Sequence, residues 1–141
     1  MRNKDALIVI IDGQGGGLGK LLVEKVRREF PEAEIAAVGA NSMATGQMLK
    51  AGASYGATGE NAVKCNCRDA DAILGAMGII AADSMHGEIS PAMAAAVSGA
   101  SCPVLLVPMP QCHVRVPAPE LPLADYVDWV IKELKKHFAE E

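Results

Sequence analysis

One stretch decides the fold of this chain: Leu7-Ile8-Val9-Ile10-Ile11-Asp12-Gly13-Gln14-Gly15-Gly16-Gly17-Leu18-Gly19-Lys20. Its unbroken apolar start is typical of a β-strand that is buried on both faces. The glycines that follow allow a tight turn, because glycine adopts positive φ without steric cost. Apolar residues then recur every fourth position, at Leu18, Leu22, Val26 and Phe30, which predicts a helix with one apolar face. The stretch therefore predicts a strand, a glycine loop and a helix in succession.

A strand, a glycine loop and a helix in this order bind phosphate in many α/β proteins. The start of the helix offers free N–H groups and the positive end of the helix dipole to an anion. We therefore expect a small phosphorylated ligand, NAD(P) or another nucleotide, at the loop. The expected binding residues are Gly13, Gln14, Gly15, Gly16, Gly17, Leu18 and Gly19.

The glycine spacing fits several known loops to different degrees. Gly13, Gly17 and Gly19 fit the G-x-x-x-G-x-G pattern of short-chain dehydrogenase-type Rossmann folds. The G-x-G-x-x-G fingerprint is imperfect, because its third glycine is replaced by Leu18. A loop that hydrolyses nucleoside triphosphates needs a Ser or Thr after its lysine, where this chain has Leu21. A turn with a purely structural role is the remaining alternative.

Composition limits the classes of protein to consider. The 141 residues are 50% hydrophobic, with a mean hydropathy of +0.20 and a net charge of −4. This length predicts a single Rossmann-like domain over residues 1–141. The basic residues lie on helix patterns interleaved with acids, so we expect no nucleic-acid partner. The first apolar run ends at Asp12, too early for a secretory signal, so we expect a cytoplasmic protein without membrane contact.

Four cysteines raise the question of a metal site: Cys65, Cys67, Cys102 and Cys112. In a cytoplasmic protein they should stay reduced. The C-x-C spacing does not match a zinc ribbon, and on a helix the two side chains would point to nearly opposite faces. We therefore expect ordinary thiols and no bound metal.

Apolar runs alternate with helix patterns along the chain, which predicts an α/β fold: a three-layer Rossmann-like sandwich with a mainly parallel sheet of about five strands. Right-handed crossovers favour the strand order 3-2-1-4-5. Ser42, Thr58 and Ser90 are the expected N-caps of three helices. The expected strands are 7–11, 34–39, 53–58, 71–76 and 103–107, and the expected helices are 17–30, 42–52, 58–66, 90–98 and a last one from 123.

Ligands of open α/β sheets bind beyond the carboxyl ends of the strands, and polar residues gather there in this sequence. Asn41 and Ser42 follow the second strand, where proteins that prefer NAD usually carry an acid. Ser84 follows the fourth strand. We expect all three to line the ligand site, although capping alone would explain Ser42.

Two residues are candidates for catalysis. His86 lies in a polar loop at this edge, and imidazole is a common acid–base group, so His86 could act as an acid or base, oriented by Glu88. It could equally be a surface histidine. Asp12 could bind a ligand hydroxyl or hold the glycine turn through its backbone amides. The Tyr-x-x-x-Lys pair of short-chain dehydrogenases is absent, because the lysine position holds Gly59 after Tyr55 and Val130 after Tyr126.

Several unusual motifs suggest a family. They are Ile11-Asp12-Gly13-Gln14-Gly15-Gly16-Gly17, Asn41-Ser42, Gly59-Glu60-Asn61-Ala62 and Ser84-Met85-His86-Gly87-Glu88-Ile89-Ser90-Pro91. Together they resemble a family of small bacterial proteins, found mainly in anaerobic Firmicutes, whose domain is of unknown function. The resemblance runs from the first strand to the fifth and leaves out the tail after Val107. It implies a bacterial cytoplasmic protein and no particular activity.

Two functions follow as hypotheses from the residues. The first is a nucleotide-binding protein, with oxidoreductase as the leading enzyme class. The second is a non-catalytic module that senses a ligand or associates with a partner. The proline-rich segment from Pro108 to Pro122 and the last helix also predict a homodimer, because Trp129 lies on a helix with a wide apolar face. The alternative is that Trp129 belongs to the core.

Overall fold

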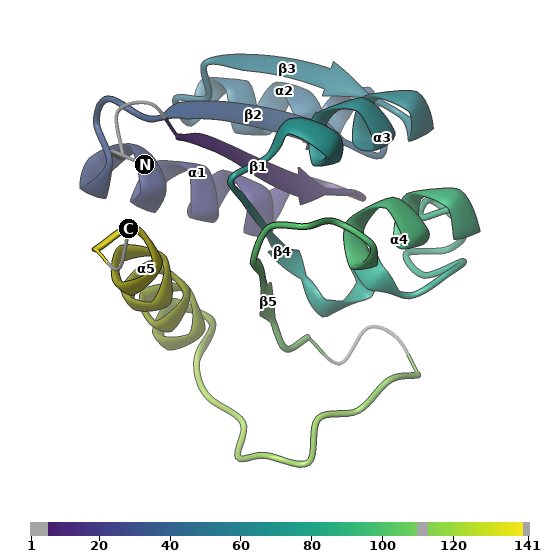
Figure 1. Cartoon of the computed structure of the whole chain (residues 1–141). Helices are drawn as coiled ribbons and strands as arrows, with labels where there is room; N and C mark the ends of the chain where they lie inside the picture. Colours follow the sequence, from purple (N-terminus) through teal and green to yellow (C-terminus); the bar gives the residue numbers. More distant parts are fainter. Residues whose placement is uncertain (1–5, 110–112, 140–141) are drawn as a thin grey trace.

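The computed structural model describes residues 6–109 and 113–139. It has five strands and five α-helices that alternate, with one short 3₁₀-helix (Figure 1). In chain order the elements are β1 (Leu7–Asp12), α1 (Gly17–Glu29), β2 (Glu34–Gly39), α2 (Ser42–Lys50), β3 (Tyr55–Thr58), α3 (Glu60–Asp69), β4 (Ala72–Ala76), η2 (Met77–Ile80), α4 (Pro91–Ser98), β5 (Val104–Val107) and α5 (Leu123–Ala139).

The five strands form one parallel sheet in the order β3-β2-β1-β4-β5, which confirms the predicted α/β class and strand order. The central strand β1 is buried from Ile8 to Asp12, as its unbroken apolar run predicts. Its residue Ile10 pairs with Ala37 on one side and with Leu74 on the other. The most hydrophobic strand therefore lies in the middle of the sheet.

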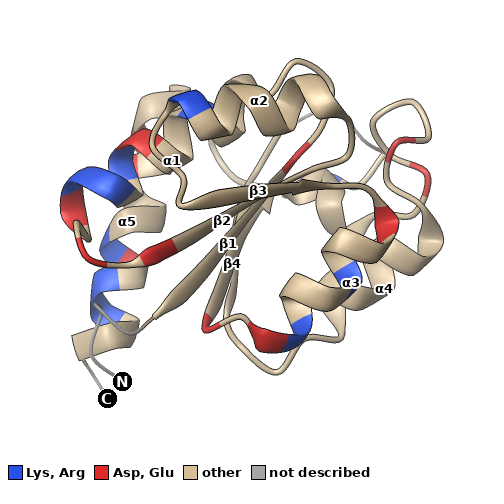
Figure 2. Ribbon diagram, turned by 90° about the horizontal axis from the view of Figure 1, so that it is seen from above, with Lys and Arg blue, Asp and Glu red and all other residues tan. Residues whose placement is uncertain are grey.

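Helices cover both faces of the sheet, so the molecule has three layers (Figure 2). The chain moves from β1 to β3 in one direction, and right-handed crossovers place α1 and α2 on the same face. From β4 to β5 the chain moves in the other direction along the sheet. This places α4 beside α3, on the face opposite to α1 and α2. The direction of winding reverses between β1 and β4, and open sheets bind ligands at that point.

The last helix returns to the face that α1 covers. Its residues Val127, Val130, Ile131 and Leu134 are buried. The ring of Phe138 lies edge-on to that of Phe30, with 5.7 Å between the ring centres. Among the residues described, no helix is both long and apolar enough to cross a membrane.

Two local predictions need correction. The N-cap of α2 is Asn41, whose side chain accepts the Ala44 N–H at 2.9 Å, so Ser42 is the first helical residue. Thr58 does not cap α3, because it is still in β3 and its hydroxyl bonds that of Thr45 at 2.7 Å. Trp129 is 55% exposed, so the alternative that it belongs to the core is wrong. By contrast, Ser90 caps α4 as predicted.

Candidate functional site

The candidate site lies at the carboxyl edge of the sheet, where the loops after β1, β2 and β4 meet. One carboxylate joins all three loops. Glu88 accepts the Gln14 N–H at 2.5 Å and the Asn41 side-chain amide at 2.7 Å. The same amide of Asn41 also donates to the carbonyl of Gln14 at 2.9 Å. The predicted gathering of these loop residues is therefore present, and Glu88 holds it together.

Asp12 fixes the glycine loop from inside. It is 6% exposed, and its two carboxylate oxygens accept the N–H groups of Gly13 at 2.8 Å and Gly19 at 2.7 Å. Burial raises the pKa of Asp12; the two N–H donors oppose this shift, and the negative charge of Glu88 adds to it. Of the two roles expected for Asp12, holding the glycine turn is the one that these contacts serve.

Two of the loop glycines are required by the fold itself, and a third is crowded by side chains. A Cβ atom at Gly13 would lie 2.8 Å from the Met85 sulfur, and one at Gly19 would lie 2.6 Å from the Met48 sulfur. Gly16 has a φ of +79°, and its Cβ would lie 2.8 Å from the backbone of Ala44. Gly16 therefore requires glycine because of its backbone conformation and packing, and Gly19 because its Cβ would also lie 2.8 Å from the Cβ of Asp12, whereas a side chain at Gly13 would displace the flexible ends of Met85 and Glu88.

Gly15 and Gly17 differ from the other three. Both are exposed, neither has positive φ, and a Cβ atom on either would meet no atom within 4 Å. Nothing in the described chain therefore requires glycine at these two positions. The N–H groups of Gly15, Gly17 and Leu18 also have no acceptor among the residues that the structure describes. The first turn of α1 contains no acid, although a carboxylate there would stabilise the helix.

The loop between η2 and α4 has an unusual backbone. Asp83, Met85 and His86 all have positive φ, between 56° and 65°, which non-glycine residues rarely adopt. The hydroxyl of Ser84 donates to the carbonyl of Gly78 and so closes the turn. Such backbone persists only where surrounding contacts hold it, and it is most common at functional sites.

This loop and the glycine loop line a pocket of about 550 Å³. Three of the predicted site residues lie on it, namely Gln14, Ser84 and His86. Asn41 contacts the pocket wall through Gln14, whereas Ser42 is exposed at the start of α2 and does not line the pocket.

His86 is exposed on the pocket, and Glu88 does not orient it, because the carboxylate of Glu88 is bound to the glycine loop. A second imidazole, that of His113, lines the same pocket. In the sequence, only the position of His113 after β5 indicates that it lies here, because the loops after β1, β4 and β5 all lie at the carboxyl edge of the sheet.

The cysteines are described in part, because Cys112 lies outside the described residues. Cys65 is exposed and Cys67 is buried, so the two side chains do point to different faces of α3 as predicted. Burial raises the pKa of Cys67 to about 11. Within the described ranges, no three His, Cys, Asp or Glu side chains are grouped as metal ligands would be.

Comparison with known proteins gives a family. Residues 7–139 match the family model DUF3842, described as a domain of unknown function. The match continues past β5 through the proline-rich segment and α5, further than the motifs alone suggested. A search of curated proteins found no match. Because the match covers nearly the whole chain, the protein belongs to the DUF3842 family.

Proposed function

We propose that this protein binds the phosphate or pyrophosphate group of a nucleotide at residues 13–19. The observation that carries the proposal is the pair Gly15 and Gly17. Glycine occupies two exposed positions where neither φ nor packing within the described chain requires it. A ligand that approaches the backbone closely would supply the missing reason, because a side chain there would collide with it.

The surroundings of the loop favour an anion. The free N–H groups of Gly15, Gly17 and Leu18 lie at the N-terminal end of α1, where the helix dipole is positive. Lys20 is exposed in the same turn. The loop also lies where the direction of winding reverses, next to a pocket of about 550 Å³ that is large enough for a nucleotide portion.

An oxidoreductase that uses NAD(P) is the enzyme class that we propose for this loop. His86 is then the side chain on the pocket best suited to exchange a proton with a substrate, because imidazole is the side-chain group that most often acts as a general acid or base. The alternative is a non-catalytic sensor. A turnover assay with NAD(P) and small alcohols or ketones separates the two, since a sensor would bind the nucleotide without oxidising or reducing it.

Thermal unfolding with nucleotides tests the binding. A ligand present at 100 times its Kd stabilises the native state by about 2.7 kcal/mol, which is a rise in Tm of roughly 10 °C for a chain of this size. Gly17→Val should abolish the rise. Gly46→Val is the matched control, because Gly46 also lies in a helix with no atom near its Cβ position, but in α2. A wild type that no nucleotide, dinucleotide or coenzyme A stabilises would refute the proposal.

The homodimer predicted from the sequence stays a prediction, and we propose that it forms around Trp129. The indole is 55% exposed on α5; Leu121, just before the helix, is 41% exposed, and Leu123, its first residue, is 38% exposed. Light scattering at micromolar concentration tests this, and Trp129→Ala should weaken the dimer. A mass near 14.7 kDa for the wild type would exclude it.

A further inference from the structure

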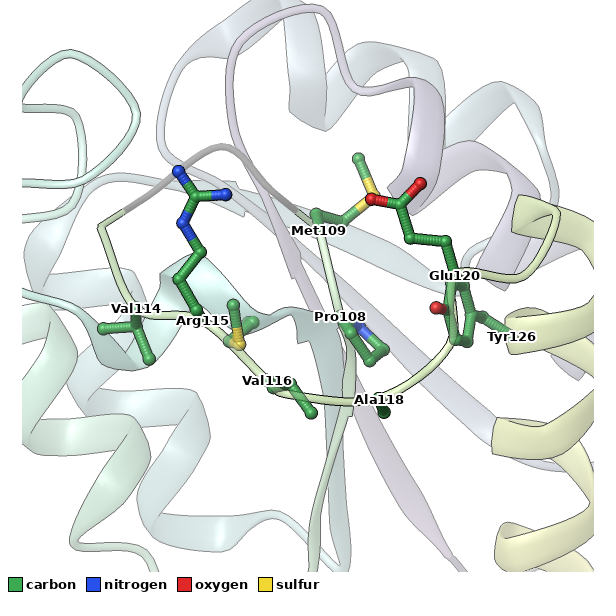
Figure 3. Close-up of a pocket in the computed structure, with 9 residues that line it drawn as sticks. Pro108, Met109, Val114, Arg115, Val116, Ala118, Glu120 and Tyr126 are labelled. Carbon is green, nitrogen blue, oxygen red and sulfur yellow. The ribbon is translucent and has the colours of Figure 1, made fainter.

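A second pocket lies at the same edge of the sheet, beyond β4 and β5 (Figure 3). Its floor includes Met77, which follows β4, and Pro108, which follows β5. Its outer wall is the segment 113–122, here called the strap. Val116 and Ala118 of the strap close the pocket on the side opposite Met109. This pocket is therefore built mainly from apolar side chains.

The strap is held in place, so the pocket exists before any ligand binds. The Tyr126 hydroxyl accepts the Leu121 N–H at 3.1 Å and donates to the Pro119 carbonyl at 3.3 Å. Pro117 and Pro119 fix φ on either side of Ala118, which reduces the entropy lost when a ligand binds.

The volume of this pocket restricts its ligand. It measures about 150 Å³, whereas the pocket beside the glycine loop measures about 550 Å³. An apolar cavity of roughly 150 Å³ accommodates a group the size of benzene. A nucleotide is therefore excluded, and a short branched aliphatic group fits.

Two opposite charges flank the pocket. Arg115 and Glu120 hold their charged ends on the same side of it, with Met109 between them (Figure 3). Neither forms an ion pair with any residue in the described ranges. A guanidinium binds a carboxylate through two parallel hydrogen bonds, and a carboxylate accepts hydrogen bonds from an ammonium group.

We propose that this pocket binds a zwitterionic small molecule with a short apolar side chain, such as an aliphatic amino acid. Arg115 binds its carboxylate, Glu120 binds its ammonium group, and the apolar side chain lies against Met77, Pro108 and Val116. The site is independent of the proposed nucleotide site, since the two pockets share no lining residue.

The test uses three ligands that differ only in charge: leucine, its carboxylate-only analogue 4-methylpentanoate, and its amine-only analogue 3-methylbutylamine. NMR titration of the full chain follows the methyl signals of Met77 and Met109. Leucine should bind about fivefold or more tightly than either analogue, because each loses one ion pair that is partly exposed to solvent.

Two variants assign the charges. Arg115→Gln should weaken leucine and 4-methylpentanoate by about fivefold and leave 3-methylbutylamine unchanged. Glu120→Gln should weaken leucine and 3-methylbutylamine by about fivefold and leave 4-methylpentanoate unchanged. Arg28→Gln, which removes an exposed cation on α1, should leave the binding of all three ligands unchanged. Gly17→Val should also bind leucine normally.

Several results would overturn the proposal. They are equal binding of leucine and either analogue, equal weakening of all three ligands by Arg115→Gln, and no methyl shift at millimolar leucine. Methyl shifts that follow protein concentration without any ligand would overturn it too, because they would show that a second copy of the chain covers the pocket.

Discussion

Asp12→Ala should destabilise the protein strongly, because it removes the acceptor of two backbone N–H groups at once. Asp12 is 6% exposed, and its bonds to Gly13 and Gly19 measure 2.8 and 2.7 Å. Each buried donor left without a partner costs about 1–3 kcal/mol. The expected loss is therefore about 2–6 kcal/mol, which is a large part of the stability of an ordinary domain.

Urea unfolding followed by far-ultraviolet circular dichroism measures this loss, and Tm should fall by roughly 8–20 °C. Asp128→Ala is the control, since the side chain of Asp128 is 64% exposed and its ion pair with Lys25 is 3.6 Å long. The control should change stability by less than about 0.5 kcal/mol. A loss below about 1 kcal/mol for Asp12→Ala would refute the idea that this carboxylate holds the loop.

The difference in stability between the wild type and Asp12→Ala should depend on pH. Burial raises the pKa of Asp12 above 3.8, so the folded state binds this proton more tightly than the unfolded state does. The contribution of Asp12 to stability is therefore largest below pH 3.8 and falls as pH rises through the folded-state pKa. The difference in unfolding free energy between wild type and Asp12→Ala should shrink from acidic to neutral pH. A difference that grows with pH would contradict an upward shift of the Asp12 pKa on folding.

Two further predictions concern other parts of the chain. Iodoacetamide at mildly alkaline pH should modify Cys65 well before Cys67, because Cys65 is exposed and burial raises the pKa of Cys67 to about 11. Peptide mass spectrometry measures the two rates of modification, and equal rates would contradict the prediction. Arg27→Ala should lower the free energy of unfolding in urea by about 1–3 kcal/mol. The guanidinium of Arg27 donates to the carbonyls of Gly52 at 3.0 Å, Pro31 at 3.1 Å and Ala33 at 2.8 Å. Arg28 is an exposed neighbour, so Arg28→Ala should lower it much less.

The sequence predicts the fold well because its signals are local and periodic. The strand at Glu34–Gly39 and the start of α4 after Ser90 agree with the structure, since burial on both faces and N-capping leave clear patterns. The error at the start of α2 has a local cause. Asn41 and Ser42 both carry a capping oxygen, and only the extended backbone of Asn41 decides between them.

The candidate site could be predicted only in part. The glycines and His86 follow from motifs and from the rule that ligands bind beyond strand ends. The bond from Glu88 to Gln14 joins residues 74 positions apart, and no local pattern indicates such a pair. Likewise, the difference between Gly15 or Gly17 and the three other glycines depends on neighbours in space. This difference between the glycines can therefore be seen only in the three-dimensional structure.

The position of α5 has a consequence for how the chain folds as it is synthesised. The face of the sheet beside α1 stays partly open until α5 has left the ribosome, because Val127, Val130, Ile131 and Leu134 complete its covering. When the strap is the last segment to have left the ribosome, every strand can have paired, yet Phe30 still lacks its aromatic partner Phe138. Chaperones that bind exposed apolar surface should therefore associate with that intermediate and leave once α5 has packed.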